Sequence, residues 1–297
     1  MPGEEPSGRF AGKLASGLAG KTAIVTGGGR GLGRAMALGL ARAGANVVIT
    51  AARGHHEIEV VADEAKTSQA GLVRGGIVGG GTVRGLTADV TSEGDGLRVV
   101  SEAVREFGSI HILVNNAGRG MRFVSENFLD TPTKFWQTDP AVWRMIVDTN
   151  VTGPFLMARA VLPHMLKQHW GRIINISMNY ETMRRAGFAP YGPSKAALES
   201  ETIIWAQDLA GTGVTVNSLL PGGVTDTGMV PDDIAPEVRR RLLSPEIMVH
   251  PLLWLVSEMA DDVTGARFVA SLWDSSLPPA QAAEKARDTS VSIVPAR

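Results

Sequence analysis

Residues 22–33 read Thr-Ala-Ile-Val-Thr-Gly-Gly-Gly-Arg-Gly-Leu-Gly, and this stretch decides the fold. Its first four residues have the apolar pattern of a strand, and a helical pattern follows from Leu32 to Ala43. Glycines let the backbone turn tightly and approach a ligand, and a helix N-terminus offers free N–H groups and a positive dipole. A strand, a glycine-rich turn and a helix in this order predict a dinucleotide-binding loop.

Short apolar runs alternate with helical patterns along the chain, which is typical of a parallel sheet between helices. We predict an α/β fold: a single-domain, Rossmann-type, doubly wound parallel sheet of about seven strands with helices on both faces. The expected strands are 21–26, 46–50, 83–88, 110–114, 171–176, 213–219 and 266–270. The expected helices are 31–43, 56–69, 93–107, 140–168, 191–210 and 246–258.

The dinucleotide-binding catalytic domain is expected to span residues 18–273. Residues 1–17 predict a flexible N-terminal extension, and residues 274–297 predict a C-terminal tail that is either a short helix or a flexible arm. Residues 71–85 form a glycine-rich link before the third strand. This link is either a surface loop or extra hairpin, or a clamp on the adenosine end of a dinucleotide.

Composition excludes several classes of protein. The 297 residues carry a net charge of −1 and no long basic run, so nucleic acid is not an expected partner. There are no cysteines, which rules out disulfides and thiolate nucleophiles, and the six histidines show no metal-ligand spacing. No apolar run reaches the roughly 18 residues of a membrane span, and the N-terminus lacks a signal-peptide core, so we expect a cytoplasmic protein.

A second motif lies at residues 191–195, which read Tyr-Gly-Pro-Ser-Lys. Tyr191 and Lys195 are four residues apart and therefore share one face of a helix. A phenol beside an ammonium can serve as an acid–base pair, because a nearby cation lowers the pKa of the phenol.

Taken in order, these motifs resemble the short-chain dehydrogenase/reductase family. The resemblance also covers Asn-Asn-Ala-Gly at 115–118, Asn150 and Pro221-Gly222, and it spans residues 18 to 270. It implies an NAD(P)-dependent oxidoreductase that transfers a hydride between nicotinamide and a ketone, aldehyde or secondary alcohol. In this role Tyr191 gives a proton to the carbonyl oxygen, Lys195 lowers the tyrosine pKa and grips the nicotinamide ribose, and Asn150 holds a relay water.

The same resemblance assigns the cofactor contacts. Gly27, Gly29, Arg30, Gly31, Leu32 and Gly33 line the pyrophosphate, Asp89 and Val90 contact the adenine, and Asn116, Ala117 and Gly118 form the floor under the ribose. Pro221, Gly222, Val224 and Thr227 hold the carboxamide, although this segment is about one residue longer than the usual spacing.

Cofactor choice follows from the end of the second strand, where no carboxylate is available to accept from ribose hydroxyls. Arg30 and Arg53 are both nearby, and guanidinium groups bind phosphate in a bidentate fork. We therefore predict NADP, with NAD possible.

Position 178 departs from the family pattern. A serine that polarises the substrate carbonyl usually stands thirteen residues before the tyrosine, where this chain has Met178. Ser177 takes that role if the strand end is re-registered, or Asn179 or Tyr180 replaces it from the loop. Otherwise the site has lost the donor and works slowly, or it acts on an imine or an activated C=C bond.

The expected substrate-lining residues, Met178, Tyr180 and Phe188, predict a mainly apolar pocket for a hydrophobic substrate. An alternative function is a cofactor-binding regulatory or scaffold protein with weak turnover. Helices 140–168 and 191–210 have broad apolar faces, and relatives pair the equivalent helices, so we expect a homodimer or homotetramer.

Overall fold

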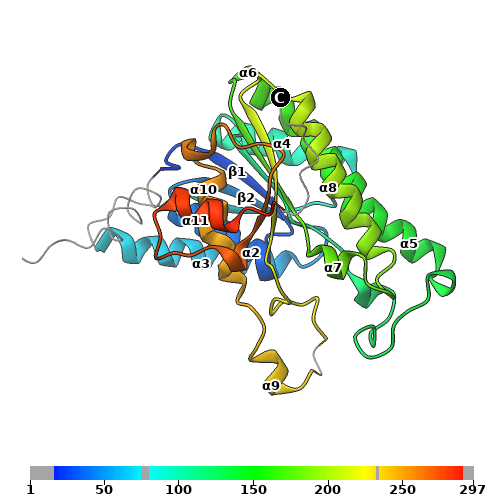
Figure 1. Cartoon of the computed structure of the whole chain (residues 1–297). Coiled ribbons are helices and arrows are strands. Elements are labelled where there is room, and N and C mark those ends of the chain that lie inside the picture. The colour runs from blue at the N-terminus through cyan, green and yellow to red at the C-terminus, as the bar shows by residue number, and fades with distance from the viewer. Residues whose placement is uncertain (1–16, 75–79, 232–233, 290–297) are drawn as a thin grey trace, which may run out of the picture.

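A computed structural model of the chain describes residues 17–74, 80–231 and 234–289. Seven parallel strands form one sheet in the order β3-β2-β1-β4-β5-β6-β7 (Figure 1). The strands are β1 (Thr22–Thr26), β2 (Asn46–Ala51), β3 (Val83–Thr87), β4 (Ile112–Asn115), β5 (Gly171–Ile176), β6 (Val214–Leu220) and β7 (Arg267–Val269). The predicted sheet is confirmed, with each strand end within two residues of its expected place.

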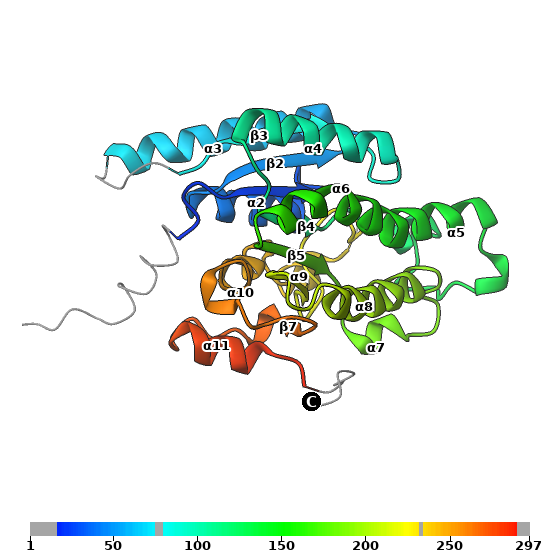
Figure 2. The ribbon, with the colours of Figure 1, turned by 90° about the horizontal axis from the view of Figure 1, so that it is seen from above.

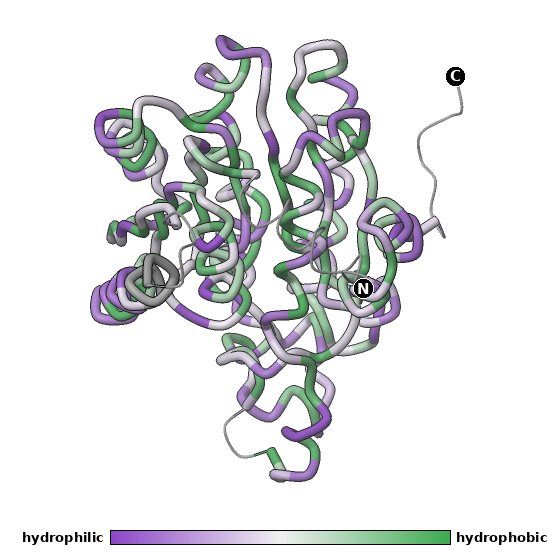
Figure 3. Tube along the Cα trace, turned by 90° about the vertical axis from the view of Figure 1, so that its left-hand side faces the viewer, coloured by the Kyte–Doolittle hydropathy of each residue, from purple (hydrophilic) through white to green (hydrophobic). Residues whose placement is uncertain are grey.

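Helices cover both faces of this sheet (Figure 2). Helices α2 (Gly31–Arg42), α3 (His55–Arg74), α10 (Val249–Leu255) and α11 (Pro279–Ala286) share one apolar core, and α4 (Glu93–Phe107), α6 (Gly153–Lys167) and α8 (Tyr191–Asp208) share the other. Side chains of β1 alternate between the two cores, Val25 in the first and Ile24 in the second. Figure 3 shows the strands as apolar segments between these layers.

The strand order reverses between β1 and β4, because the chain winds from β1 outward to β3 and then crosses to β4 on the other side. A ligand in a doubly wound sheet lies at this switch point, outside the carboxyl ends of the strands. The glycine loop follows β1 there, residues 116–118 follow β4, and residues 177–179 follow β5. Three stretches that are far apart in sequence therefore meet at one edge of the sheet.

The predicted helix at 140–168 is interrupted. The structure has α5 (Pro140–Val147), a π-helical turn (Asp148–Thr152) and then α6. Pro154 has no N–H to donate to the Asn150 carbonyl four residues earlier, so the α-helical ladder cannot continue unbroken through this point. π-Helical turns of this kind are frequent at functional sites.

Other boundaries also differ from the sequence prediction. Helix α3 extends to Arg74, five residues beyond its expected end, and the expected helix at 246–258 is a 3-10 turn (Pro245–Met248) followed by the short α10. Two short helices were not predicted, α7 (Tyr180–Met183) and α9 (Pro236–Arg239).

The two ends of the glycine-rich link at 71–85 therefore belong to regular elements, α3 and β3. Its middle, residues 75–79, lies outside the described residues, as do residues 1–16 of the predicted extension.

The described part of the predicted C-terminal tail contains helix α11, one of its two predicted forms, and residues 290–297 lie outside the described residues. The α11 residues Ala282, Ala283 and Ala286 are buried, and the last two belong to the core that contains Trp254. Beyond the helix, Arg287 forms an antiparallel bridge with Phe268 of β7. The packed unit thus continues past residue 273, where the sequence predicted the domain to end. None of the helices in the described ranges is long and apolar enough to cross a membrane.

Candidate active site

The glycine loop brings the backbone of β1 and α2 very close together. Gly27 and Gly31 have φ of 65° and 52°, in the left-handed region that favours glycine. A Cβ atom at Gly33 would overlap the Gly27 carbonyl and stand 2.5 Å from Asn116 Nδ2. Only glycine therefore fits at position 33.

The first turn of α2 is open to an anion. Its N-cap residue, Arg30, makes no side-chain capping bond, and the turn holds no acidic residue. The N–H groups of this turn therefore retain hydrogen-bonding capacity next to the positive end of the helix dipole. These features fit the pyrophosphate of a dinucleotide.

Asn116 fixes the loop from the other side of the switch point. Its Nδ2 donates to the carbonyls of Thr26 (2.8 Å) and Gly27 (3.0 Å), and its backbone N–H donates to Thr26 Oγ1 at 3.0 Å. Ala117 N–H donates to the same hydroxyl. Asn116 thus holds the glycine loop itself, and its role in the floor under the ribose stays a prediction.

The segment after β6 reaches the glycine loop through Thr227. A Cβ at Gly31 would stand 3.1 Å from Thr227 Cγ2, whereas Thr225 is buried and forms a bridge with Leu243. Of the two threonines, Thr227 is the one beside the predicted pyrophosphate site. Pro221 and Gly222 turn the chain out of β6, and Val224 is exposed.

The adenosine end contains a carboxylate that the sequence analysis missed. Glu57, in the first turn of α3, has Oε1 3.6 Å from Arg30 Nη1, and a Cβ at Gly29 would stand 3.1 Å from Glu57 Cβ. The expectation that no acid opposes the arginines is therefore wrong for Arg30. That expectation considered only the end of β2, and Glu57 arrives from the following helix. Arg53 is exposed.

Asp89 and Val90 have clear local roles. The Asp89 carboxylate accepts from the backbone N–H and hydroxyl of Thr91, and Ser92 caps α4 by accepting from Asp95 N–H. Val90 is buried, and a Cβ at Gly153 would stand 2.7 Å from Val90 Cγ2. Val90 therefore packs against the start of α6.

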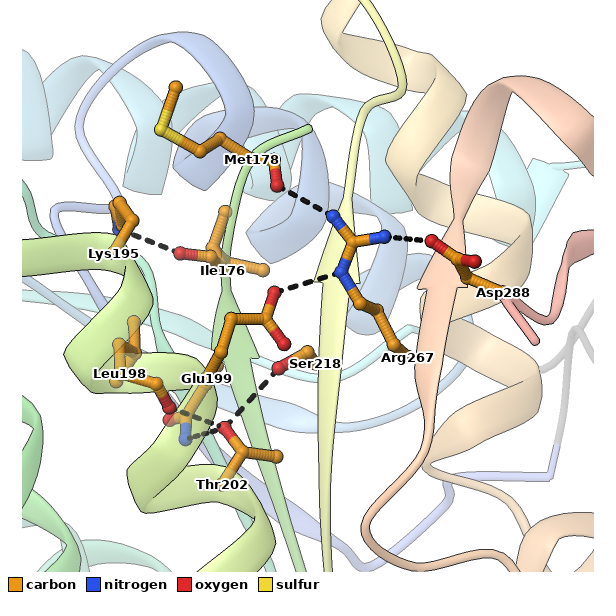
Figure 4. A network of polar contacts seen from close by, with 10 residues as sticks. Ile176, Met178, Lys195, Leu198, Glu199, Thr202, Ser218, Arg267 and Asp288 are labelled. Carbon is orange, nitrogen blue, oxygen red and sulfur yellow. Dashed lines mark hydrogen bonds and ion pairs between the residues drawn. The ribbon is translucent and has the colours of Figure 1, made fainter. Parts of the chain in front are cut away.

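Lys195 is buried on α8, and its Nζ donates to the Ile176 carbonyl at 2.7 Å (Figure 4). Burial lowers the pKa of Lys195 to about 8, with Glu199 acting in the opposite direction. Burial raises the pKa of Tyr191 to about 12, and no charged group contributes. The expected lowering of the tyrosine pKa by Lys195 is therefore wrong for the protein alone, because the ammonium is bonded to the end of β5 and the phenol is desolvated.

Asn150 lies in the π-helical turn and is fully buried. Its Nδ2 donates to Ser194 Oγ and to the Arg119 carbonyl, both at 2.9 Å, and its Oδ1 accepts from Arg119 N–H at 2.8 Å. Ser194 Oγ in turn donates to the Tyr191 carbonyl at 2.7 Å. Ser194, which the sequence analysis did not single out, therefore joins Asn150 to the first turn of α8.

A model of the short-chain dehydrogenase family matches residues 21–237, which include the glycine loop, Asn150, Tyr191 and Lys195. The chain belongs to the short-chain dehydrogenase/reductase family. It is therefore an NAD(P)-dependent oxidoreductase that acts on alcohols or carbonyl compounds.

Relatives with assigned names agree with this membership. The chain is 34% identical to 2-(S)-hydroxypropyl-CoM dehydrogenase 3 of Xanthobacter autotrophicus, over 82% of this chain and 92% of the relative. It is also 34% identical to the 3-oxoacyl-[acyl-carrier-protein] reductase FabG of Aquifex aeolicus, over 84% and 94% of the two chains. A solved structure of a proposed NAD(P)-dependent gluconate 5-dehydrogenase from Beutenbergia cavernae, with NADP bound at low occupancy, matches with a TM-score of 0.71 and 29% identity over 86% of this chain and 97% of that one.

In this short-chain dehydrogenase, Ser177 and Met178 differ in their exposure to solvent. Ser177 Oγ is fully buried and has no hydrogen-bond partner among the residues that the structure describes. Met178 is partly exposed, and Figure 4 shows its side chain on the side of the backbone away from Arg267. Neighbouring side chains in an extended chain point to opposite sides, so the Met178 side chain is partly exposed on one side while the Ser177 hydroxyl is buried on the other.

Tyr180 and Phe188 each have contacts of their own. The Tyr180 ring lines a pocket of about 300 Å³ together with Glu199, Arg267 and Asp288, and neither Tyr191 nor Lys195 lines that pocket. Phe188 is buried, with its ring against Phe128. The prediction that these two aromatic rings line the substrate pocket is not supported by their contacts, because Tyr180 turns toward β7 and Phe188 packs between loops.

The pKa of Lys195 gives a stability test. Its folded-state pKa of about 8 lies below its ordinary 10.5, so the buried ammonium destabilises the folded protein at neutral pH, and this cost is lost as the pH rises through that window. The substitution Lys195→Met should therefore be most favourable for the stability of the folded protein, relative to the parent, near neutral pH. Its unfolding free energy relative to the parent should fall by about 3 kcal/mol by pH ~10, since one pKa unit is worth about 1.4 kcal/mol.

Urea unfolding over this pH range measures the difference. Lys66→Met, at an exposed lysine of α3, is the control for exchanging an ammonium for a thioether at the surface. A Lys195→Met difference that stays constant with pH would contradict the buried ammonium.

Proposed function

We propose that this short-chain dehydrogenase/reductase uses NADP(H) to interconvert a hydrophobic ketone or aldehyde and its alcohol. The observation that carries the proposal is the meeting of Tyr191, Lys195 and Asn150 at the sheet edge that also holds the glycine loop. The apolar character of the substrate is supported by Met178 and by Met229, whose sulfur would stand 3.6 Å from a Cβ at Gly120. Thioethers adapt to irregular apolar shapes.

The residues of this chain then handle the proton while a bound nicotinamide supplies or accepts the hydride. Tyr191, kept as a neutral phenol by burial, donates its proton to the carbonyl oxygen. Lys195 provides a positive charge close to this helix face, and the Asn150–Ser194 bonds fix the helix start that carries the phenol. Proton donation, positive charge and orientation of the phenol thus come from different side chains.

Tyr191→Phe should remove most turnover, by at least about 100-fold, because general-acid catalysis contributes that much or more. The NADPH dissociation constant should stay within about twofold, since the phenol acts in the chemical step. The measurements are NADPH oxidation at 340 nm with a carbonyl panel and NADPH binding by fluorescence. Turnover within threefold of the parent would remove Tyr191 from the proposed role.

Cofactor preference depends on two opposite charges. Arg30 is largely exposed at 71% of its side chain and can turn to a 2′-phosphate, whereas Glu57 beside it repels one. We propose that the arginine decides the balance and that NADPH binds more tightly than NADH. The NADP in the Beutenbergia cavernae structure supports this choice.

Arg30→Ala should narrow the affinity gap between NADPH and NADH by about 1–3 kcal/mol, the range for a charged hydrogen bond. Glu57→Gln should widen the gap, because it removes the repelling anion. Glu59→Gln is the matched control, since Glu59 is an exposed acid of the same helix that pairs with His55. Titration of each variant with both cofactors is the measurement. If neither change alters the affinity difference between NADPH and NADH that the parent shows, Arg30 and Glu57 are surface charges without a role in cofactor choice.

A second candidate, reduction of an imine or an activated C=C bond, is favoured by Met178 and by the burial of Ser177, which leave no serine hydroxyl to assist Tyr191 at the carbonyl oxygen. A panel that contains ketones, cyclic imines and enones separates the two. NADPH binding with no oxidation by any of them would favour a cofactor-binding scaffold instead.

The assembly is also a proposal. Helices α6 and α8 lie side by side in Figure 2 and expose Phe155, Leu166 and Ile204, at 45%, 39% and 52%. Contiguous exposed apolar surface marks an interaction site. We propose that these two helices pair with those of a second copy, giving a homodimer or homotetramer. The cytoplasm stays a prediction.

Ile204→Glu should dissociate the assembly, because it places a charge in an apolar contact. Light scattering after size exclusion measures the mass. Val60→Glu, at a comparably exposed apolar residue of α3, should leave the mass unchanged. A monomeric parent would refute the proposed pairing.

A further inference from the structure

Arg267, the first residue of β7, joins four parts of the chain. Its Nε donates to Glu199 Oε1 at 3.0 Å, its Nη2 donates to the Met178 carbonyl at 2.7 Å, and its Nη1 donates to the Asp288 carboxylate (Figure 4). The Tyr180 ring covers one face of the guanidinium, with its centroid 3.9 Å from Cζ. Every nitrogen of this guanidinium therefore has a partner on a different element.

The side chain is held tightly. Arg267 is only 8% exposed and Glu199 also 8%, so the pair is shielded from solvent. Asp288 holds Arg267 a second time, because its backbone N–H donates to the Arg267 carbonyl at 2.8 Å. A guanidinium with three anchors in fixed directions has little rotational freedom, and it transmits the positions of those anchors to one another.

The three anchors have different relations to the catalytic pair. Glu199 lies one turn beyond Lys195 on α8, so it belongs to the helix that also carries Tyr191. Met178 follows Ser177 at the end of β5 and occupies the position where the family has its carbonyl-polarising serine. Asp288 follows α11 and lies in the chain segment that borders β7.

Met178 is the anchor that lies between two regular elements, β5 and α7. The last ladder bond of β5 is Ser177 N–H to the Leu219 carbonyl, at 2.9 Å, and α7 begins two residues after Met178. The Arg267 bond holds the Met178 carbonyl on one side of the chain, and its side chain then projects to the other side (Figure 4). Releasing the carbonyl would free the peptide between β5 and α7.

We propose that Arg267 is a positioning residue: it fixes the loop at 177–180 beside the catalytic helix, in a geometry set jointly by Glu199 and by the C-terminal segment through Asp288. This inference rests on the proposed function only in that the loop borders the reacting carbonyl. The C-terminal segment, which touches no reacting group, thereby acts on the chemical step.

The first readout is independent of activity. Hydrogen exchange of the full-length protein, with peptides covering residues 177–184, follows the amides of Met183 and Arg184 at the end of α7, which donate to the carbonyls of Asn179 and Tyr180. Arg267→Lys keeps the charge but cannot span three anchors, so these amides should exchange about tenfold faster. Asp288→Ala should have a similar effect, and Asp288→Glu should restore most of the protection.

Asp261→Ala is the matched control. Asp261 also pairs with a buried arginine, Arg172, but at the opposite end of β5. It should lower the melting temperature without changing exchange in residues 177–184. Two results would overturn the positioning role. One is hydrogen exchange in residues 177–184 that is as slow in the Asp288→Ala and Arg267→Lys variants as in the parent. The other is exchange in these residues that is as fast in the Asp261→Ala variant as in those two.

The second readout is kinetic. With a substrate that the parent reduces, Asp288→Ala should lower kcat about tenfold while the KM for NADPH stays within about twofold, because the loop borders the carbonyl and not the cofactor. An unchanged kcat with faster exchange would overturn the link to the chemical step. A parent that turns over no member of the panel would refute the proposed function, and the exchange experiment would still decide the role of Arg267.

Discussion

The close backbone approach between the glycine loop and α2 is the constraint on which the rest of the site depends. Gly33 has no room for a Cβ against the Gly27 carbonyl and the Asn116 amide. Because Asn116 also bonds Thr26 and Gly27, this contact locks the ends of β1 and β4 on both sides of the switch point. The open N-terminus of α2, the floor at 116–118 and the facing Thr227 all take their places from it.

Much of this arrangement could be predicted because it is recorded locally in the sequence. Glycines at the end of a strand, Asn150 before a proline at position 154, and a tyrosine four residues before a lysine each have short-range signatures. The features that were missed join residues remote in sequence. Glu57 reaches Arg30 from the next helix, and Arg267 meets Glu199 and Met178 across 68 and 89 positions. Single-sequence patterns carry no information on such pairs.

One prediction, the lowering of the Tyr191 pKa by Lys195, failed for a different reason, because it treated the side chains without their desolvation. Tyr191 and Lys195 share a helix face, yet the ammonium bonds the Ile176 carbonyl, and burial dominates the pKa of both groups. Ser177 lies one residue from the expected position, and in extended chain this shift turns its hydroxyl into the interior. Position along the chain gave the right neighbourhood for these residues but not their orientation.

The two pKa shifts decide which protonation states Tyr191 and Lys195 have at neutral pH. Burial moves the pKa of Lys195 to about 8 and that of Tyr191 to about 12, so on raising the pH the lysine loses its proton before the tyrosine does. Reduction of a carbonyl needs a neutral phenol as donor, which is the form that burial favours, whereas oxidation of an alcohol needs a phenolate as base. With the protein's own charges alone, Tyr191 therefore carries its proton at neutral pH. Oxidation would need an additional positive charge close enough to the phenol to overcome its desolvation.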